Sequence, residues 1–128
     1  MKLLVFIAIG GAIGAVARYG VGGWVHNVAG SSFPWGTFGV NLLGSFVLGF
    51  AIRALHASTV APELRGFLTV GLLGAFTTFS TFSYEAVTLV QDGEWLRASA
   101  YLFGSVAAGV AAVIAGLWLA SLALHARA

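Results

Sequence analysis

The chain has no cysteine, two prolines, one methionine and few charged residues among its 128 positions. Without cysteine, disulfides, thiolate metal sites and cysteine nucleophiles are all excluded. Charged residues make up 8% of the chain, whereas an average soluble domain carries about 25%. The six basic residues are too few to form a nucleic-acid-binding surface. No nucleophile–base pair or metal-ligating cluster is recognisable, so the sequence does not predict an enzyme.

The chain is instead rich in apolar residues, which make up 59% of it and are gathered into long runs. A helix that crosses a bilayer needs about 20 mostly apolar residues. Four runs meet this length: 3–25, 33–52, 66–90 and 98–124. The sequence therefore predicts an all-α membrane protein, with a single transmembrane domain over residues 1–128 and four helices in the lipid bilayer.

The first run also resembles a secretory signal, because Lys2 precedes an apolar core that ends in Ala15-Val16-Ala17. The apolar run resumes after Arg18, which favours an uncleaved first helix. Basic residues in loops indicate orientation. With four spans, one side of the membrane carries Lys2, Arg53, Arg65 and Arg127, and the other carries Arg18 and Arg97. This distribution favours cytoplasmic termini.

Small and polar residues recur at helical spacing inside the runs. The second run has Thr37, Asn41, Ser45 and Gly49 on one face, because residues four apart are neighbours on a helix. The first run has Gly10 and Gly14, and the fourth has Gly104, Ala108, Ala112 and Gly116. Such patterns favour close helix packing in lipid. For Asn41 two interpretations stay open, because a carboxamide at membrane depth must find partners or line a wet path.

The third run contains GAFTTFSTFS at residues 74–83, with five Ser or Thr among ten residues. Gly and adjacent β-branched Thr are poor helix formers, so we expect a helix break near Gly74–Thr78. Freed carbonyl oxygens would suit a cation such as Na⁺. Phe79 and Phe82 would present electropositive ring edges beside hydroxyl donors, an environment for a small anion. Ordinary aromatic packing is the alternative.

Three segments resemble one known family over essentially the whole chain. They are GGAIGAVARY (10–19), WGTFGVNLLGSFVLG (35–49) and GLLGAFTTFSTFS (71–83). Because the three segments occur in this order on a chain with four spans, the sequence resembles the CrcB/Fluc fluoride channels. The resemblance implies an antiparallel, dual-topology homodimer with two pores in the inner (plasma) membrane. It also implies passive fluoride export from the cytoplasm, which confers fluoride resistance.

The resemblance also implies roles for individual residues. It places the fluoride pore at Asn41, Phe79, Ser80, Thr81, Phe82, Tyr101 and Ser105. It places Arg18 in the vestibule and Glu85 near the pore entrance. It implies a structural Na⁺ at the dimer interface, held by the main-chain carbonyls of Gly74 and Thr77.

The chain departs from the family pattern at a few positions, and two other functions stay open. Ala75 stands where many members have Gly, and Gly109 and Val113 offer no hydroxyl beyond Ser105. The first alternative is a small four-span multidrug exporter. It needs a carboxylate in the first span, and residues 3–25 contain none. The second is a non-transporting anchor or assembly subunit, which would need a cofactor ligand or a large partner face.

Overall fold

The computed structural model describes residues 1–126, so Arg127, which entered the charge distribution above, lies outside the described residues. Within this part all regular secondary structure is helical, and there is no strand. In chain order the elements are α1 (Lys2–Ala29), α2 (Trp35–His56), α3 (Pro62–Gly66), the π-helix η1 (Phe67–Leu73), α4 (Gly74–Phe76), α5 (Phe79–Gln91) and α6 (Trp95–His125). The predicted all-α class is confirmed.

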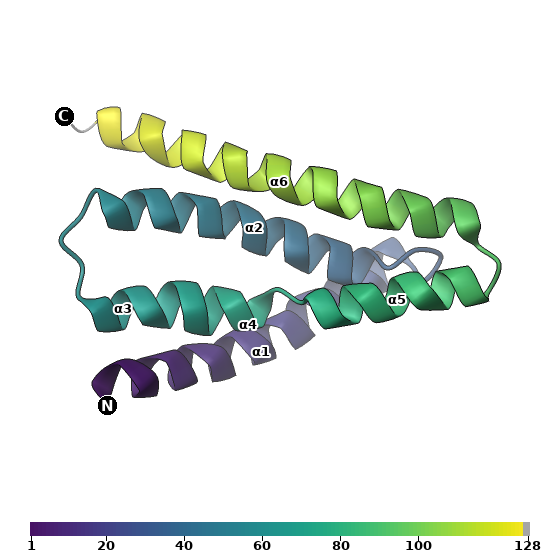
Figure 1. Ribbon diagram of the computed structural model, residues 1–128, viewed down its shortest axis with the longest axis horizontal. Helices are drawn as coiled ribbons and strands as arrows, with labels where there is room; N and C mark the ends of the chain where they lie inside the picture. The colour runs from purple at the N-terminus through teal and green to yellow at the C-terminus, as the bar shows by residue number, and fades with distance from the viewer. Residues whose placement is uncertain (127–128) are drawn as a thin grey trace.

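Four segments are long and apolar enough to cross a membrane. Three are the single helices α1, α2 and α6, and the fourth is the stretch Pro62–Gln91, here called the third span. Each begins or ends within a few residues of the apolar run that predicted it. Figure 1 shows the third span, α2 and α6 running alongside one another, with the N-terminus and the end of α6 at the same end of the bundle.

The helices approach each other closely at glycines. Where α2 meets α6, a Cβ on Gly49 would collide with the Val113 carbonyl, and one on Gly116 would collide with the Phe46 carbonyl. Both helices therefore pack backbone against backbone, as the small-residue pattern predicts. Gly104 meets no atom within 4 Å, so that part of the fourth-run pattern takes no part in packing within the chain.

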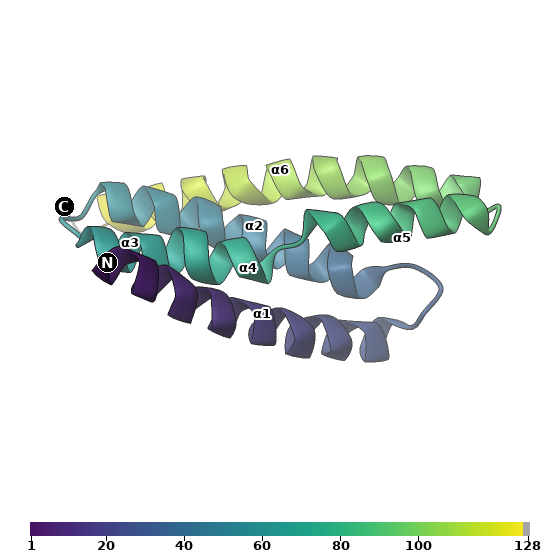
Figure 2. The same ribbon diagram turned by 60° about the horizontal axis from the view of Figure 1, so that its bottom comes forward.

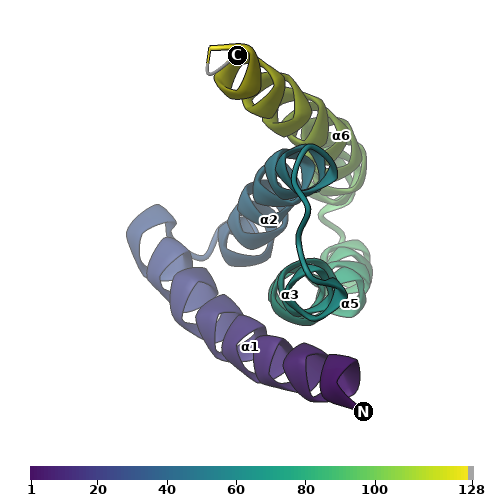
Figure 3. The same ribbon diagram turned by 90° about the vertical axis from the view of Figure 1, so that its left-hand side faces the viewer.

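The first half of α1 packs against η1 through a second set of glycines. A Cβ on Gly10 would lie 2.5 Å from the Phe67 carbonyl oxygen, and one on Gly14 would collide with the Leu72 carbonyl. The predicted packing role of both glycines is confirmed. Figures 2 and 3 show that α1 is inclined to the other helices and diverges from the third span toward its own C-terminal end. This divergence leaves room between α1, α2 and α5.

The third span is divided into pieces. Its π-helical part, Phe67–Leu73, was not predicted, because the sequence signal there is an unbroken apolar run. Thr69 donates its hydroxyl hydrogen to the Arg65 carbonyl (2.9 Å), a back-bond that loosens the regular α ladder. Further along, Thr77 (φ −79°, ψ 157°) and Thr78 (φ −148°, ψ 119°) are extended. The helix break predicted within Gly74–Thr78 therefore falls at its last two residues.

Candidate functional site

Asn41 braces the helix break from the neighbouring helix α2. Its side-chain Nδ2 donates to the Thr78 carbonyl oxygen at 3.0 Å, and its Oδ1 accepts from the Thr78 amide at 2.8 Å. Thr78 is 8% exposed, so these main-chain groups have no water to replace the carboxamide. Of the two interpretations left open for Asn41, the structure thus supplies the first, a partner at membrane depth.

Thr78 also begins the second half of the third span. Its hydroxyl oxygen accepts from the Thr81 amide (3.3 Å) and donates its hydrogen to the Thr81 hydroxyl (3.0 Å), and it lies 3.4 Å from the Ser80 hydroxyl. This is the N-cap arrangement that Thr favours, because it satisfies one amide of the first helical turn. The break therefore gathers three hydroxyls at the start of α5.

The break takes main-chain groups of both polarities out of the helical hydrogen-bond ladder. The Thr78 amide, which in a continuous helix would donate to the Gly74 carbonyl, donates to Asn41 instead, and the Thr81 amide donates to the Thr78 hydroxyl instead of the Thr77 carbonyl. The first amides of α5 likewise lack the carbonyl partners that a continuous helix would supply. One discontinuity thus offers oxygen ligands at the end of α4 and N–H donors at the start of α5.

Glu85 joins three helices. Its Oε1 accepts a hydrogen bond from the Thr37 hydroxyl of α2 (2.9 Å), and its Oε2 accepts one from the Tyr101 hydroxyl of α6 (2.7 Å). Tyr101 is fully buried. The structure brings together two residues that the sequence analysis assigned to the entrance and the pore. It also adds Thr37, whose position four residues before Asn41 was interpreted only as helix packing.

One turn after Tyr101 on α6, the Ser105 hydroxyl oxygen is buried and has no hydrogen-bond partner within residues 1–126. It is the single buried side-chain polar atom in this part of the chain with that property. A buried hydroxyl without a partner is costly and calls for a ligand, an ion or a water molecule.

A row of aromatic rings runs from the break to the loop between α1 and α2. Ring centroids are 5.7 Å apart for Phe79 and Phe82, 5.0 Å for Phe82 and Tyr101, and 5.3 Å for Tyr101 and Phe33. Phe82 is 7% exposed but Phe79 is 78% exposed. The two rings are adjacent, as their spacing predicts, yet one of them is uncovered in the single chain.

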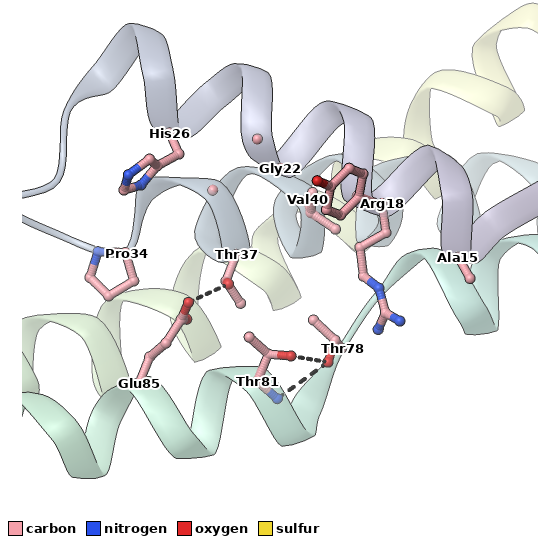
Figure 4. A pocket seen from close by; sticks show the side chains of 13 residues that line it. Ala15, Arg18, Gly22, His26, Pro34, Thr37, Val40, Thr78, Thr81 and Glu85 are labelled. Carbon is pink, nitrogen blue, oxygen red and sulfur yellow. Dashed lines mark hydrogen bonds between the residues drawn. The ribbon is translucent and has the colours of Figure 1, made fainter.

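A cavity of about 600 Å³ lies between α1, α2 and α5 and borders the break. Figure 4 shows Arg18 reaching into it from α1, with Thr78, Thr81 and Glu85 on the opposite wall. Arg18 lies near the middle of α1, because α1 extends to Ala29. Within the described chain the one ion pair is Arg97–Glu94 (3.3 Å), so the Arg18 guanidinium makes none.

Comparison with known proteins matches this chain to one family. The family model described as CrcB-like protein, Camphor Resistance (CrcB), matches residues 5–117. The fluoride-specific ion channel FluC of Hahella chejuensis is 52% identical, over 94% of this chain and 96% of the relative. The protein of the same name from Geobacter sulfurreducens is 46% identical, over 94% and 98%. That from Thermus thermophilus is 48% identical, over 81% and 82%. The chain therefore belongs to the CrcB family.

Proposed function

We propose that this protein is a fluoride-specific ion channel of the inner membrane, through which fluoride leaves the cytoplasm passively and fluoride toxicity is lowered. The observation that carries the proposal is its near-full-length identity of about half to relatives named as such channels. The four membrane-spanning segments make it a multi-pass protein. It is a transport protein and not an enzyme.

The path for fluoride needs donors that replace its hydration water without trapping it. The residues proposed for it are Asn41, Phe79, Ser80, Thr81, Phe82, Tyr101 and Ser105. Several features support them: the amides of the first turn of α5, the adjacent hydroxyls and ring edges, and the unpartnered Ser105 hydroxyl. Arg18 supplies a fixed positive charge in the cavity, and Glu85, the residue proposed for the entrance, lines the same cavity.

A single chain leaves this path open on one side. Phe79 is 78% exposed and Tyr84 73%, and Gly74, Ser80 and Thr81 are exposed beside them. These residues surround the break, so polar main-chain groups would face lipid unless another protein surface covers them. We infer that a second copy of the chain covers this face, in an antiparallel, dual-topology homodimer.

Dual topology predicts that each loop is found on both sides of the membrane. Because the chain has no native cysteine, Ser32→Cys and Thr59→Cys each introduce a unique thiol, in loops at opposite ends of the bundle. We expect a membrane-impermeant maleimide to label about half of each variant in sealed vesicles, and all of it after permeabilisation. If one variant labels completely and the other not at all, the dimer is parallel.

The break also fits a structural Na⁺. The carbonyl oxygens of Gly74 and Thr77 lose their usual helical donors, because the Thr78 and Thr81 amides bond to side chains, and neutral oxygens suit a hard monovalent cation. Within residues 1–126 no group of three or more His, Asp or Glu side chains could hold a metal, so main-chain oxygens are the available ligands. We propose that both subunits contribute this pair of carbonyls at the dimer interface. The ion would supply positive charge that offsets the unpaired oxygens beside the fluoride path.

Removing Na⁺ is therefore expected to weaken both structure and transport. After prolonged exchange into N-methylglucamine, we expect a lower unfolding temperature in detergent, partial loss of dimer on gel filtration and reduced fluoride flux. Each should recover when Na⁺ is restored, because the protein has lost only a ligand. If neither the unfolding temperature nor the fluoride flux changes when Na⁺ is removed, the proposed Na⁺ site is wrong.

Fluoride efflux from liposomes that contain only this protein tests the function itself. We expect efflux, recorded with a fluoride electrode, to start when a potassium ionophore lets K⁺ leave with fluoride and so prevents a membrane potential from building up. Protein-free liposomes should show no efflux. The alternative, a multidrug exporter, predicts cation–proton exchange and no fluoride efflux. It is disfavoured because α1 contains no Asp or Glu to carry the proton.

A further inference from the structure

His26 lies where two cavities meet. The cavity of about 600 Å³ that contains Arg18 shares lining residues with a second cavity of about 280 Å³, which lies toward the loop after α1 and the end of α5. His26, Pro34 and Glu85 line both. Figure 4 shows the imidazole beside Pro34, across the cavity from Glu85. An ion that passes from the second cavity into the cavity that contains Arg18 therefore passes this ring.

The His26 ring is exposed where the two cavities meet, and no hydrogen bond to it is found in the described part of the chain. The titratable or charged side chains that share its cavities are Arg18 and Tyr19 from α1, Tyr84 and Glu85 from α5, and Asp92 after α5. The lining residues of α2 and of the loop before it carry none. Histidine is the side-chain type whose ordinary charge change falls between pH 5 and 8.

We propose that His26 is a titratable residue of the fluoride path, whose protonated ring attracts fluoride into the cavity and makes the fluoride current rise as pH falls. The proposal rests on the channel function proposed above and adds a residue to it. Arg18 provides a charge that does not vary with pH, and His26 adds a second positive charge only in acid. Because Glu85 and Asp92 also line these cavities, a positive charge on His26 would offset negative charge that repels fluoride, and the local potential of a cleft sets the concentration of ions in it.

The expected size of the effect follows from Coulomb's law. A unit charge about 7 Å from an ion in water changes the local concentration of that ion by about two- to threefold. Both cavities are open to solvent, so salt screens this interaction, and the effect should shrink above about 0.1 M ionic strength. The effect should also vanish at saturating fluoride, because the charge acts on entry.

Current through the full-length protein in planar bilayers provides the test, since neutral hydrogen fluoride carries no current. At low fluoride and low ionic strength, lowering the pH on both sides from 7.5 to 5.5 should raise the wild-type current about two- to threefold. His26→Gln should give a current that does not change with pH. His26→Lys should give one that is high at both values.

His56→Gln is the matched control, because His56 is an exposed histidine at the other end of the bundle. It should keep the wild-type rise in acid. The proposal is overturned if the wild-type current is the same at both pH values, or if His26→Gln rises as the wild type does, which would assign the titration to Glu85 or Asp92. Wild-type protein without fluoride current at either pH would contradict the channel function and this role together.

Discussion

Replacing Phe79 or Phe82 by isoleucine is expected to reduce fluoride flux to about a fifth of the wild-type value or less, because an electropositive ring edge is worth about 1 kcal/mol to a dehydrating anion. Isoleucine keeps most of the bulk and loses the edge. The two ring centroids are 5.7 Å apart at the start of α5, next to the break. Fluoride efflux from liposomes measures the effect, and gel filtration shows whether the protein still assembles.

Phe6→Ile is the matched control, because it makes the same exchange on α1 at a partly exposed ring far from the break. It should leave flux unchanged. Wild-type flux in both Phe79→Ile and Phe82→Ile would show that the ring edges do not carry the ion. A loss of flux together with a loss of folded protein would be expected of Phe82 alone if it served only as packing, since Phe79 is 78% exposed and Phe82 is 7% exposed.

Asn41→Leu should cause a large loss of stability as well as flux. The substitution removes both hydrogen bonds to Thr78 and leaves a buried amide and a buried carbonyl unpaired. At about 1–3 kcal/mol for each such group, the expected loss is roughly 2–6 kcal/mol. Thermal unfolding in detergent and fluoride efflux measure the two consequences.

Two further variants separate bracing the break from contacting the ion. Asn41→Asp keeps an acceptor for the Thr78 amide but, when ionised, has no donor for the Thr78 carbonyl. We expect it to lose about half of the stability lost by Asn41→Leu, and to lose flux completely through its negative charge. Ser45→Ala, one turn further along α2, should keep wild-type stability. If Asn41→Leu unfolds at the wild-type temperature, the brace is not needed and Asn41 acts on the ion alone.

Local features of the sequence predicted much of this fold. Long apolar runs located the four spans, and β-branched Thr77 and Thr78 predicted the break, because both signals depend on neighbouring residues only. Glycine spacing predicted the contacts of Gly10, Gly14 and Gly116 for the same reason. What each glycine contacts was beyond such reasoning, as the open surroundings of Gly104 show.

The connections within the site were not predictable from one sequence. Asn41 and Thr78 are 37 residues apart, and Thr37 and Glu85 are 48 apart, so their hydrogen bonds exist only once α2 and the third span have packed together. The position of His26 depends on α1 continuing to Ala29, beyond the apolar run that predicted it. Thr78 had a sequence signal that was missed: a threonine before a helical turn is a favoured N-cap.

The divided third span has a consequence for how the protein enters the membrane during synthesis. It has the lowest hydropathy of the four spans, and the break splits it into halves that are each too short to cross a bilayer of about 30 Å. The amide and carbonyl of Thr78, which the break removes from the helix ladder, bond to Asn41 on α2. The π-helical half of the span packs on the glycines of α1. Both partners precede it in the chain. The third span is therefore synthesised after α1 and α2, when the surfaces to which it hydrogen-bonds and packs are already in the membrane. The order of the spans along the chain thus favours insertion of the least hydrophobic one.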